Sequence, residues 1–378
     1  MKRFLLGAIN LNLVRPSLKP ISPPLLRSPI SSTLNMAPTN RAAWITAEKA
    51  YPLDVKEAPY TRPGDNEIVI HNRAIALNLV DFARQLLGAG LFAWTTYPAI
   101  LGTDVAGEVV EVGTGASSRF KVGDRVVGLG SELKNNTPHE GAFQDYVVLQ
   151  SQLVSHIPSS LSYEDASVIP LGISTAACGL FQKDHLALQF PTEPRAPSTG
   201  ETVLIWSGSS SVGTNAIQLA VAAGYEVFTT ASPKNHEYVK SLGASQAWDY
   251  RSPTLVKDIV AAFAGKKSAG ALAIGDGAAG PASEIVSRVE GKKFVSLASP
   301  PTGELAGGVA SKFIFGGDLK DNEVGPAVFE AYLPEALEAG TFQAKPLGEV
   351  VGHGLEAIQK GLDDLKAGVS AKKLVIKL

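Results

Sequence analysis

The chain has few of the residues that build disulfides and metal sites. Cys178 is its single cysteine, so neither an internal disulfide nor a multi-cysteine zinc site can form. The six histidines are scattered and form no metal-ligand pattern. Cys178 lies in a predicted helix over residues 175–181, where we expect a small buried thiol.

An excess of one charge and long apolar runs are also missing. The 34 basic and 36 acidic residues leave a net charge of −2, which gives no electrostatic case for binding nucleic acid or an anionic membrane. No apolar run reaches the length of a membrane span. The 378 residues, 45% of them hydrophobic, can bury a large core and predict two domains.

The first 47 residues contain no Asp or Glu, and the first acid is Glu48. They carry Lys, Arg, Ser and Pro, as an organelle transit peptide does. Met36 stands just before a strand-like run over residues 41–45, and a start there would give a shorter form without a leader. Mitochondrial import and a cytoplasmic shorter form therefore both stay open, as does a disordered N-terminal tail that carries no targeting signal. Residues 1–38 are excluded from the fold prediction.

The remaining sequence changes its pattern near residue 163. Short strands with Gly and Pro between them, such as 67–71 and 104–112, predict a barrel-like β domain before that point. Strands and helices then alternate over residues 203–298, which predicts a parallel sheet with right-handed crossovers. The proline-rich segment 182–200 is predicted to be exposed. We expect the C-terminal residues 348–377 to return to the β domain.

A turn of small residues joins a predicted strand, 203–206, to a predicted helix, 214–223. Such a turn directs the free N–H groups of the helix N-terminus at an anion. Gly208 and Gly213 stand where the first and third glycines of a dinucleotide fingerprint belong, and Ser210 replaces the middle one. The predicted pyrophosphate site consists of Gly208, Ser209, Ser210, Ser211, Val212 and Gly213.

A second strand, 226–231, ends in Ser232-Pro-Lys-Asn. An NAD enzyme would place an acid there to accept hydrogen bonds from the ribose hydroxyls, and this chain has none. Ser232, Lys234 and Asn235 instead supply donors and a positive charge, which suit a 2′-phosphate. They predict NADPH as the cofactor, with a polar helix N-cap and a solvated lysine as the alternative.

Several segments, in this order and spacing, resemble the medium-chain dehydrogenase/reductase superfamily. The chain is most similar to its zinc-independent quinone oxidoreductases and its fungal trans-acting enoyl reductases. The segments that carry the resemblance, beside the glycine turn, are Ala76–Asp81, Leu101–Gly113, Phe120–Val126, Gly141–Tyr146, Pro170–Ala177 and Ser241–Ala244.

The resemblance implies an α/β protein of two domains with an active site in the cleft between them. One is a GroES-like β-rich substrate domain, expected over residues 39–168 and 341–378. The other is a Rossmann domain with a doubly wound parallel sheet, expected over residues 169–340.

The zinc ligands of related alcohol dehydrogenases are missing. Asn78 stands at the position of a ligand Cys, Thr103 at that of a His, and Leu171 at that of the third ligand. Because a catalytic zinc needs three protein ligands, we predict no metal. Alcohol oxidation is harder without a metal to polarise the oxygen. Hydride addition to a conjugated double bond is favoured, since a hydrogen bond can stabilise the developing enolate.

The resemblance also assigns further site residues, each with an ordinary alternative. Asn78 and Thr175 match positions close to the nicotinamide and are the predicted catalytic residues; the alternatives are a turn amide and a helix N-cap. Tyr250 matches a residue near the adenosine, or is an aromatic at the edge of the core. Lys372 borders the cofactor, or is a surface lysine. Asp81 is expected to order its own loop.

Two functions are consistent with these residues. The first is an NADPH-dependent oxidoreductase that reduces an activated alkene, an enoyl thioester or a quinone. Phe92 and Trp94 indicate a small hydrophobic substrate, free or carrier-bound. The second is a non-catalytic NADPH-binding sensor or structural partner, since residues 82–96 contain no tyrosine that could donate a proton. We expect no nucleic-acid or membrane partner, and either a monomer or a homodimer.

Overall fold

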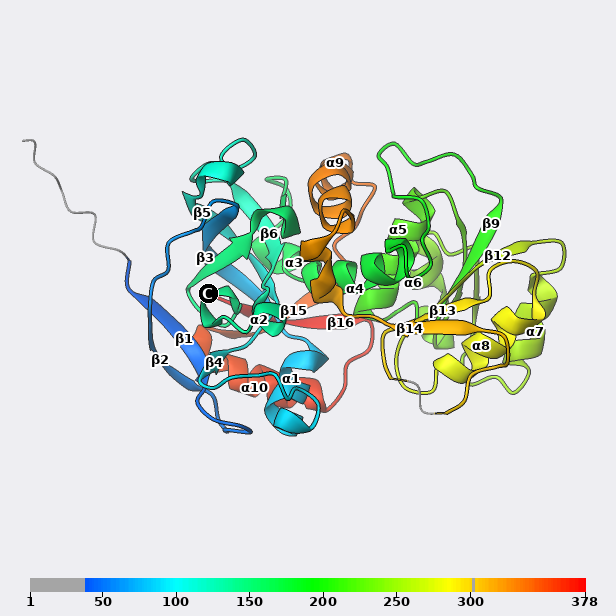
Figure 1. Ribbon diagram of the computed structural model, residues 1–378, viewed down its shortest axis with the longest axis horizontal. Helices are drawn as coiled ribbons and strands as arrows, with labels where there is room; N and C mark the ends of the chain where they lie inside the picture. The colour runs from blue at the N-terminus through cyan, green and yellow to red at the C-terminus, as the bar shows by residue number, and fades with distance from the viewer. Residues whose placement is uncertain (1–37, 301–302) are drawn as a thin grey trace, which may run out of the picture. The chain divides into compact units, whose positions relative to one another are not determined.

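The computed structural model describes residues 38–300 and 303–378 (Figure 1). The predicted leader, apart from its last residue, lies outside the described residues. None of the described helices is both long and apolar enough to cross a membrane.

The N-terminal part of the chain and its last two strands form two mainly antiparallel sheets, in agreement with the predicted β-rich domain. The smaller sheet has the order β2-β1-β4, and the larger has the order β15-β16-β3-β5-β6-β8 with β7 paired to β3. The strands are β1 Asn40–Ile45, β2 Asp54–Ala58, β3 Glu67–Ala76, β4 Ala99–Ile100, β5 Asp104–Val112, β6 Arg125–Leu129, β7 Tyr146–Gln150, β8 Val154–His156, β15 Leu347–His353 and β16 Lys372–Lys377.

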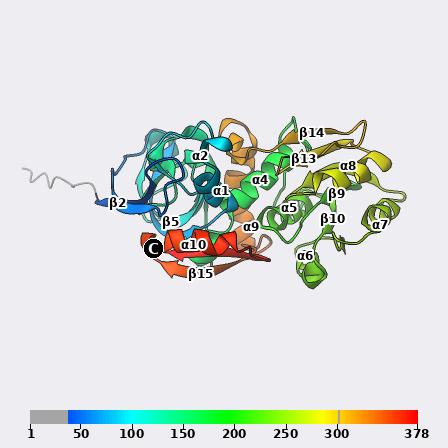
Figure 2. The same ribbon diagram turned by 90° about the horizontal axis from the view of Figure 1, so that it is seen from below.

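The C-terminal strand β16 lies inside the larger sheet. It pairs antiparallel with β3, where Val375 lies opposite Ala76, and parallel with β15. Helix α10, Ile358–Lys366, packs on β15, β16 and helix α1, Leu79–Leu87 (Figure 2). The last residues of the chain are thereby brought beside the start of α1, which is decisive for the site.

A third sheet, of six parallel strands, has the order β11-β10-β9-β12-β13-β14 and confirms the Rossmann prediction. The chain runs outward from β9 in one direction and from β12 in the other, so the topological switch point lies between these strands, where such sheets bind ligands. The strands are β9 Glu201–Ile205, β10 Glu226–Thr230, β11 Gln246–Trp248, β12 Lys267–Ala273, β13 Phe294–Leu297 and β14 Ala310–Phe313.

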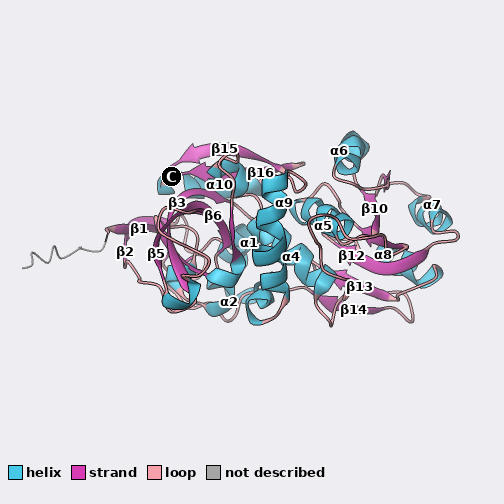
Figure 3. Cartoon of the chain, turned by 90° about the horizontal axis from the view of Figure 1, so that it is seen from above, coloured by secondary structure: helices cyan, strands magenta, loops and turns pink. Residues whose placement is uncertain are grey.

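Helices accompany this sheet, and α8 lies against β12 and β13 (Figure 3). The predicted helix over residues 326–339 is a π-helical segment, Pro326–Tyr332, that continues into α9. The helices from α3 to α9 are α3 Tyr163–Ala166, which packs on β3, β5, β15 and β16 of the β-rich sheet, α4 Pro170–Phe181, α5 Ser211–Ala222, α6 His236–Ser241, α7 Leu255–Ala262, α8 Ala279–Arg288 and α9 Leu333–Ala339.

The prediction that residues 182–200 are exposed is partly wrong. His185, Leu186 and Leu188 are 3%, 1% and 7% exposed. Leu186 packs so closely on Gly270 that a Cβ added there would lie 2.5 Å from its side chain. The prolines exclude regular structure in this segment but do not keep its apolar side chains out of the core.

Candidate active site

The glycine turn between β9 and α5 is shaped by its own hydrogen bonds. Ser210 is the N-cap of α5, where its Oγ accepts from the Gly213 N–H at 3.0 Å and donates to the Ser207 carbonyl at 2.7 Å. A Cβ added to Gly208 would lie 2.1 Å from Thr229 Oγ1, and one added to Gly213 would lie 2.2 Å from the Ser207 carbonyl oxygen. The tight turn therefore needs glycine at both fingerprint positions.

The same turn leaves backbone donors free. The N–H groups of Ser209, Ser211 and Val212 donate to no other residue that the structure describes. They stand at the N-terminus of a 12-residue helix, where the free N–H groups and the helix dipole favour an anion. These residues fit the pyrophosphate of a dinucleotide, and the turn follows β9 at the switch point of the sheet.

The three residues predicted to bind a 2′-phosphate follow β10. Asn235 donates from Nδ2 to Ser209 Oγ at 3.2 Å, which places it against the glycine turn. Ser232 is the N-cap residue of the 3₁₀ turn Pro233–Asn235 and Asn235 that of α6, neither with a side-chain cap bond, so the alternative of a polar N-cap stays open beside the phosphate site. Lys234 is exposed and forms no ion pair within residues 38–300 and 303–378.

Tyr250 follows β11 and is 45% exposed. The Arg251 guanidinium lies 5.4 Å from the centroid of its ring and pairs with Asp249 at 3.1 Å. The ring is thus available for stacking. Its predicted contact with the adenosine stays a prediction.

A buried lysine that the sequence did not single out lies at the junction of β16, α1 and α5. The side chain of Lys373 is 4% exposed. Its ammonium donates to Asn78 Oδ1 at 2.6 Å and to Asp104 Oδ2 at 2.6 Å, and lies 3.5 Å from Ser211 Oγ. This contact joins the β-rich sheet to the first residue of the helix behind the glycine turn.

Lys372, the predicted cofactor neighbour, points the other way. Its ammonium pairs with Glu349 of β15 at 2.7 Å on the surface, since successive strand residues face opposite sides of a sheet. The sequence held a signal for the difference, because one of two consecutive lysines in a buried strand must face inward. Asp104, in a strand of apolar residues, is the acid that such a lysine needs.

Asn78 is the N-cap of helix α1, directly before its first residue Leu79. Its backbone N–H donates to Asp81 Oδ2 at 2.9 Å, so Asp81 orders this segment as expected. Burial raises the pKa of the Asp81 carboxyl to about 7, and its Oδ1 has no hydrogen-bond partner among the described residues. The Asn78 side chain donates from Nδ2 to Thr103 Oγ1 at 3.1 Å.

The residues at the zinc-ligand positions do come together, but they do not fit zinc. Asn78 contacts Thr103, and the Leu171 N–H donates to Asp104 Oδ1 at 2.6 Å. They offer an amide, a hydroxyl and an apolar side chain, while a zinc site uses thiolates, imidazoles and carboxylates. The Lys373 ammonium already neutralises Asp104. Across the part of the chain that the structure describes, no three His, Cys, Asp or Glu side chains could hold a metal ion.

Helix α4 carries Thr175 and Cys178. Thr175 is the sixth residue of the helix, so the N-cap alternative is wrong. Its hydroxyl faces the segment after β14, where a Cβ added to Gly316 would lie 3.1 Å from Thr175 Oγ1. Cys178 is fully buried, as predicted, and burial raises the pKa of its thiol to about 12.

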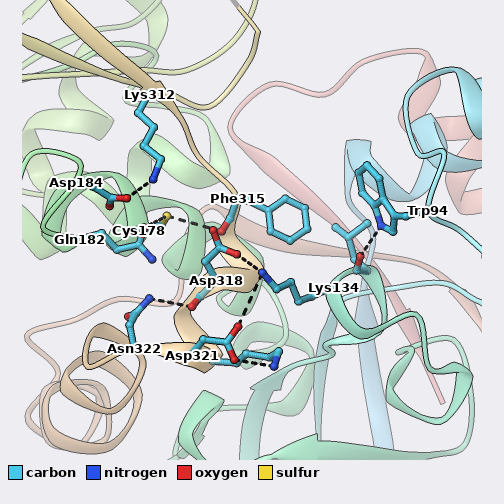
Figure 4. A network of polar contacts seen from close by, with 12 residues as sticks. Trp94, Lys134, Cys178, Gln182, Asp184, Lys312, Phe315, Asp318, Asp321 and Asn322 are labelled. Atoms are coloured by element: carbon cyan, nitrogen blue, oxygen red, sulfur yellow. Dashed lines mark hydrogen bonds and ion pairs between the residues drawn. The ribbon is translucent and has the colours of Figure 1, made fainter.

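The aromatic residues predicted for the substrate lie beside this segment. Trp94 packs edge-to-face with Phe92. It also packs edge-to-face with Phe315, at 6.3 Å between ring centroids (Figure 4). The Lys134 ammonium lies 5.5 Å from the Phe315 ring centroid and pairs with Asp318. Trp94 is 48% exposed and Phe92 only 7%, so Trp94 offers the larger apolar surface to a ligand.

Comparison with known proteins gives one family match in the N-terminal part and relatives that match most of the chain. The alcohol dehydrogenase GroES-like domain family matches residues 64–159. A dehydrogenase, pigH, of Monascus ruber is 52% identical over 369 residues, covering 90% of this chain and 100% of that protein. A trans-enoyl reductase, himH, of Aspergillus japonicus is 40% identical over 343 residues, covering 90% and 97%.

Solved structures agree with the fold. An alcohol dehydrogenase superfamily protein from Novosphingobium aromaticivorans superposes with a TM-score of 0.72 at 26% identity, covering 90% of this chain and 100% of that one. A mycobacterial protein complexed with NADPH gives a TM-score of 0.66 at 21% identity, covering 90% and 100%.

Proposed function

We propose that this chain, a member of the medium-chain dehydrogenase/reductase superfamily, uses NADPH to reduce the conjugated double bond of an α,β-unsaturated carbonyl compound. The family membership shows a nicotinamide-dependent oxidoreductase. The single observation that carries this proposal is the corner formed by Asn78, Thr103, Asp104 and Lys373. It offers hydrogen-bond donors at the position where zinc-dependent relatives need metal ligands.

NADPH is preferred over NADH because of the residues that follow β10. Ser232, Lys234 and Asn235 provide a hydroxyl, an ammonium and an amide, and no carboxylate competes with a 2′-phosphate there. Lys234 is exposed and free of an internal partner among the described residues. The N-terminus of α5 is the second anion site and would bind the pyrophosphate of the cofactor.

The bound cofactor supplies a hydride to the β-carbon of the acceptor. Negative charge then develops on the carbonyl oxygen, and Asn78 is placed to stabilise it. One Nδ2 proton of Asn78 bonds to Thr103, while the contact to the Ala76 carbonyl is long, at 3.5 Å. The second Nδ2 proton is therefore available to the acceptor, and a proton from solvent completes the reduction at the α-carbon.

The acceptor is expected to be apolar and to include thioesters. Trp94 exposes almost half of its surface and contacts Phe315, which follows β14 beside Thr175. The relative named trans-enoyl reductase supports an enoyl thioester, free or bound to a carrier protein. Quinones are the alternative acceptors, because they are also conjugated carbonyl compounds.

Stopped-flow oxidation of bound NADPH tests the reaction with enones, quinones and enoyl thioesters. We expect turnover with at least one class and the highest kcat/KM with an enoyl thioester. Tight NADPH binding without turnover of any acceptor would instead favour a non-catalytic sensor.

Equilibrium binding tests the cofactor. We expect Lys234→Ala to weaken NADPH about tenfold, the loss of one charge-assisted contact, with little change for NADH. Lys240→Ala is the matched control, since Lys240 is exposed on the next helix and pairs with Glu237. Equal affinity of the wild type for NADH and NADPH would contradict the assignment.

A further inference from the structure

We infer that Lys373 is a positioning residue that fixes the Asn78 side-chain amide with its amino group toward the acceptor oxygen. The inference rests on the proposed function, in which Asn78 meets that oxygen. Asn78 alone does not determine its own orientation, because an amide can turn either its donor or its acceptor toward the same place.

The chemistry of an ammonium decides the orientation. Lys373 can only donate, so the atom of Asn78 that lies 2.6 Å from its Nζ must be the acceptor Oδ1. Nδ2 then points to the opposite side, where Thr103 Oγ1 accepts one of its protons at 3.1 Å. A flipped amide would bring two donors together at Lys373.

Lys373 is itself fixed and does not bind the acceptor. Two of its protons have close acceptors in Asn78 and Asp104, and Ser211 Oγ lies 3.5 Å from the ammonium. Asp104 is fully buried and also accepts from the Leu171 N–H. With a side chain 4% exposed, Lys373 acts through Asn78, which is 8% exposed.

The ammonium also strengthens the donor that it orients. A positive charge beside Oδ1 polarises the amide, and hydrogen bonds in a buried chain reinforce one another. The donor aimed at the developing oxyanion is thus fixed in place before the substrate binds, as efficient oxyanion stabilisation requires.

The test compares Lys373→Met with Lys377→Met, a matched control on the same strand whose ammonium pairs with Glu164 at the surface. We expect Lys373→Met to lower kcat by about 10²-fold, as loss of an oriented oxyanion donor does, with little change in KM. In an Asn78→Ala background the same substitution should change kcat less than about threefold, because the group it acts through is gone.

Asp104→Asn combined with Lys373→Met guards against misfolding. This pair removes both buried charges, and the amide oxygen of the introduced asparagine can still accept from the Leu171 N–H. We expect the double variant to fold and to show the same kcat loss. A folded double variant with wild-type kcat, or additive effects of Lys373→Met and Asn78→Ala, would overturn the inference.

Binding of 4-nitrophenol to the complex with NADP⁺ separates this inference from the proposed function, because the phenolate mimics an enolate oxygen without turnover. We expect Lys373→Met to weaken this binding about tenfold relative to Lys377→Met. If the wild type reduced no acceptor, the proposed reaction would fail, while this difference would still support the role of Lys373. Equal binding by both variants would refute that role, with or without turnover.

Discussion

Two lysines mark the two polar regions of the site, and their surroundings differ. Lys373 is buried between β16, α1 and α5, and its ammonium makes close bonds to Asn78 and Asp104 within the protein. Lys234 is exposed beyond β10 and has no ion-pair partner among the described residues. The charge of the first region is paired within the protein, and the charge of the second is exposed to solvent.

The difference separates a residue that orients chemistry from one that selects a ligand. A buried charge must be paired in the fold itself, since removal from water costs several kcal/mol. An exposed charge needs no partner within the protein and can bind a phosphate, although salt screens this interaction. Stability should therefore depend on the partners of Lys373, and cofactor affinity on Lys234.

The largest effect is expected from Asp104→Leu. This substitution leaves the Lys373 ammonium buried without its anion and should lower the free energy of unfolding by about 3–5 kcal/mol in urea titrations. Glu349→Leu, which breaks the exposed pair with Lys372, should cost no more than about 1 kcal/mol. Similar losses of unfolding free energy in the two variants would show that burial does not make the Lys373–Asp104 pair contribute more to stability than the exposed pair.

A second buried carboxylate in the same region, Asp81, has no cation at hydrogen-bond distance among the described residues. Burial raises its pKa from 3.8 to about 7, so between these pH values the folded chain holds a proton that the unfolded chain has lost. Its contribution to stability is therefore highest below about pH 4 and falls as the pH rises to about 7.

Asp81→Asn removes this titration. The unfolding free energy of the variant should rise relative to wild type between about pH 4 and 7, by at most about 1.4 kcal/mol per pH unit, and stay level above. Urea titrations at several pH values measure the difference. Glu237→Gln, at an exposed carboxylate, should run parallel to wild type throughout. A parallel course for Asp81→Asn would rule out the raised pKa.

Sequence and structure agree best where local pattern decides. The strand–turn–helix around Gly208 and Gly213 is predictable, because spacing and the need for small residues leave few alternatives. The parallel order of β9 to β13 follows from the alternation of strands and helices. Strand β14 was missed, since its four residues are all exposed and show no burial alternation.

The polar corner was only half predictable. Asn78 and Thr103 could be identified by position. The role of Lys373 depends on two contacts that are distant in sequence: one with Asn78, 295 positions away, and one with Asp104, 269 positions away. No local pattern encodes such a pairing. Lys373 shares one face of β16 with Val375, so the register in which Val375 lies opposite Ala76 turns Lys373 inward and Lys372 outward.

Salt should affect the two regions differently. Raising NaCl from about 0.05 to 0.5 M shortens the screening length severalfold and should weaken NADPH binding by roughly three- to tenfold, through the exposed Lys234. NADH binding should respond less, because the charge at the 2′ position is absent. The kcat should hardly change, since Lys373 is shielded from ions. Fluorescence titrations and steady-state rates measure these effects, and an equal salt response of both cofactors would contradict the role of Lys234.

A lysine of intermediate exposure should give the smallest effect. Lys134 is 32% exposed, pairs with Asp318, and lies over the Phe315 ring (Figure 4). Because water screens this pair, Lys134→Met should lower the free energy of unfolding by about 0.5 kcal/mol, half that of a good surface pair.

The same substitution should also raise the KM for an apolar acceptor severalfold at constant kcat, since Phe315 and Trp94 lose a neighbour that orders them. Lys183→Met, at a more exposed pair with Glu323, should change neither quantity. A fall in kcat would mean that Phe315 and Trp94 orient the reacting atoms, a role that we propose for Lys373 and Asn78 alone.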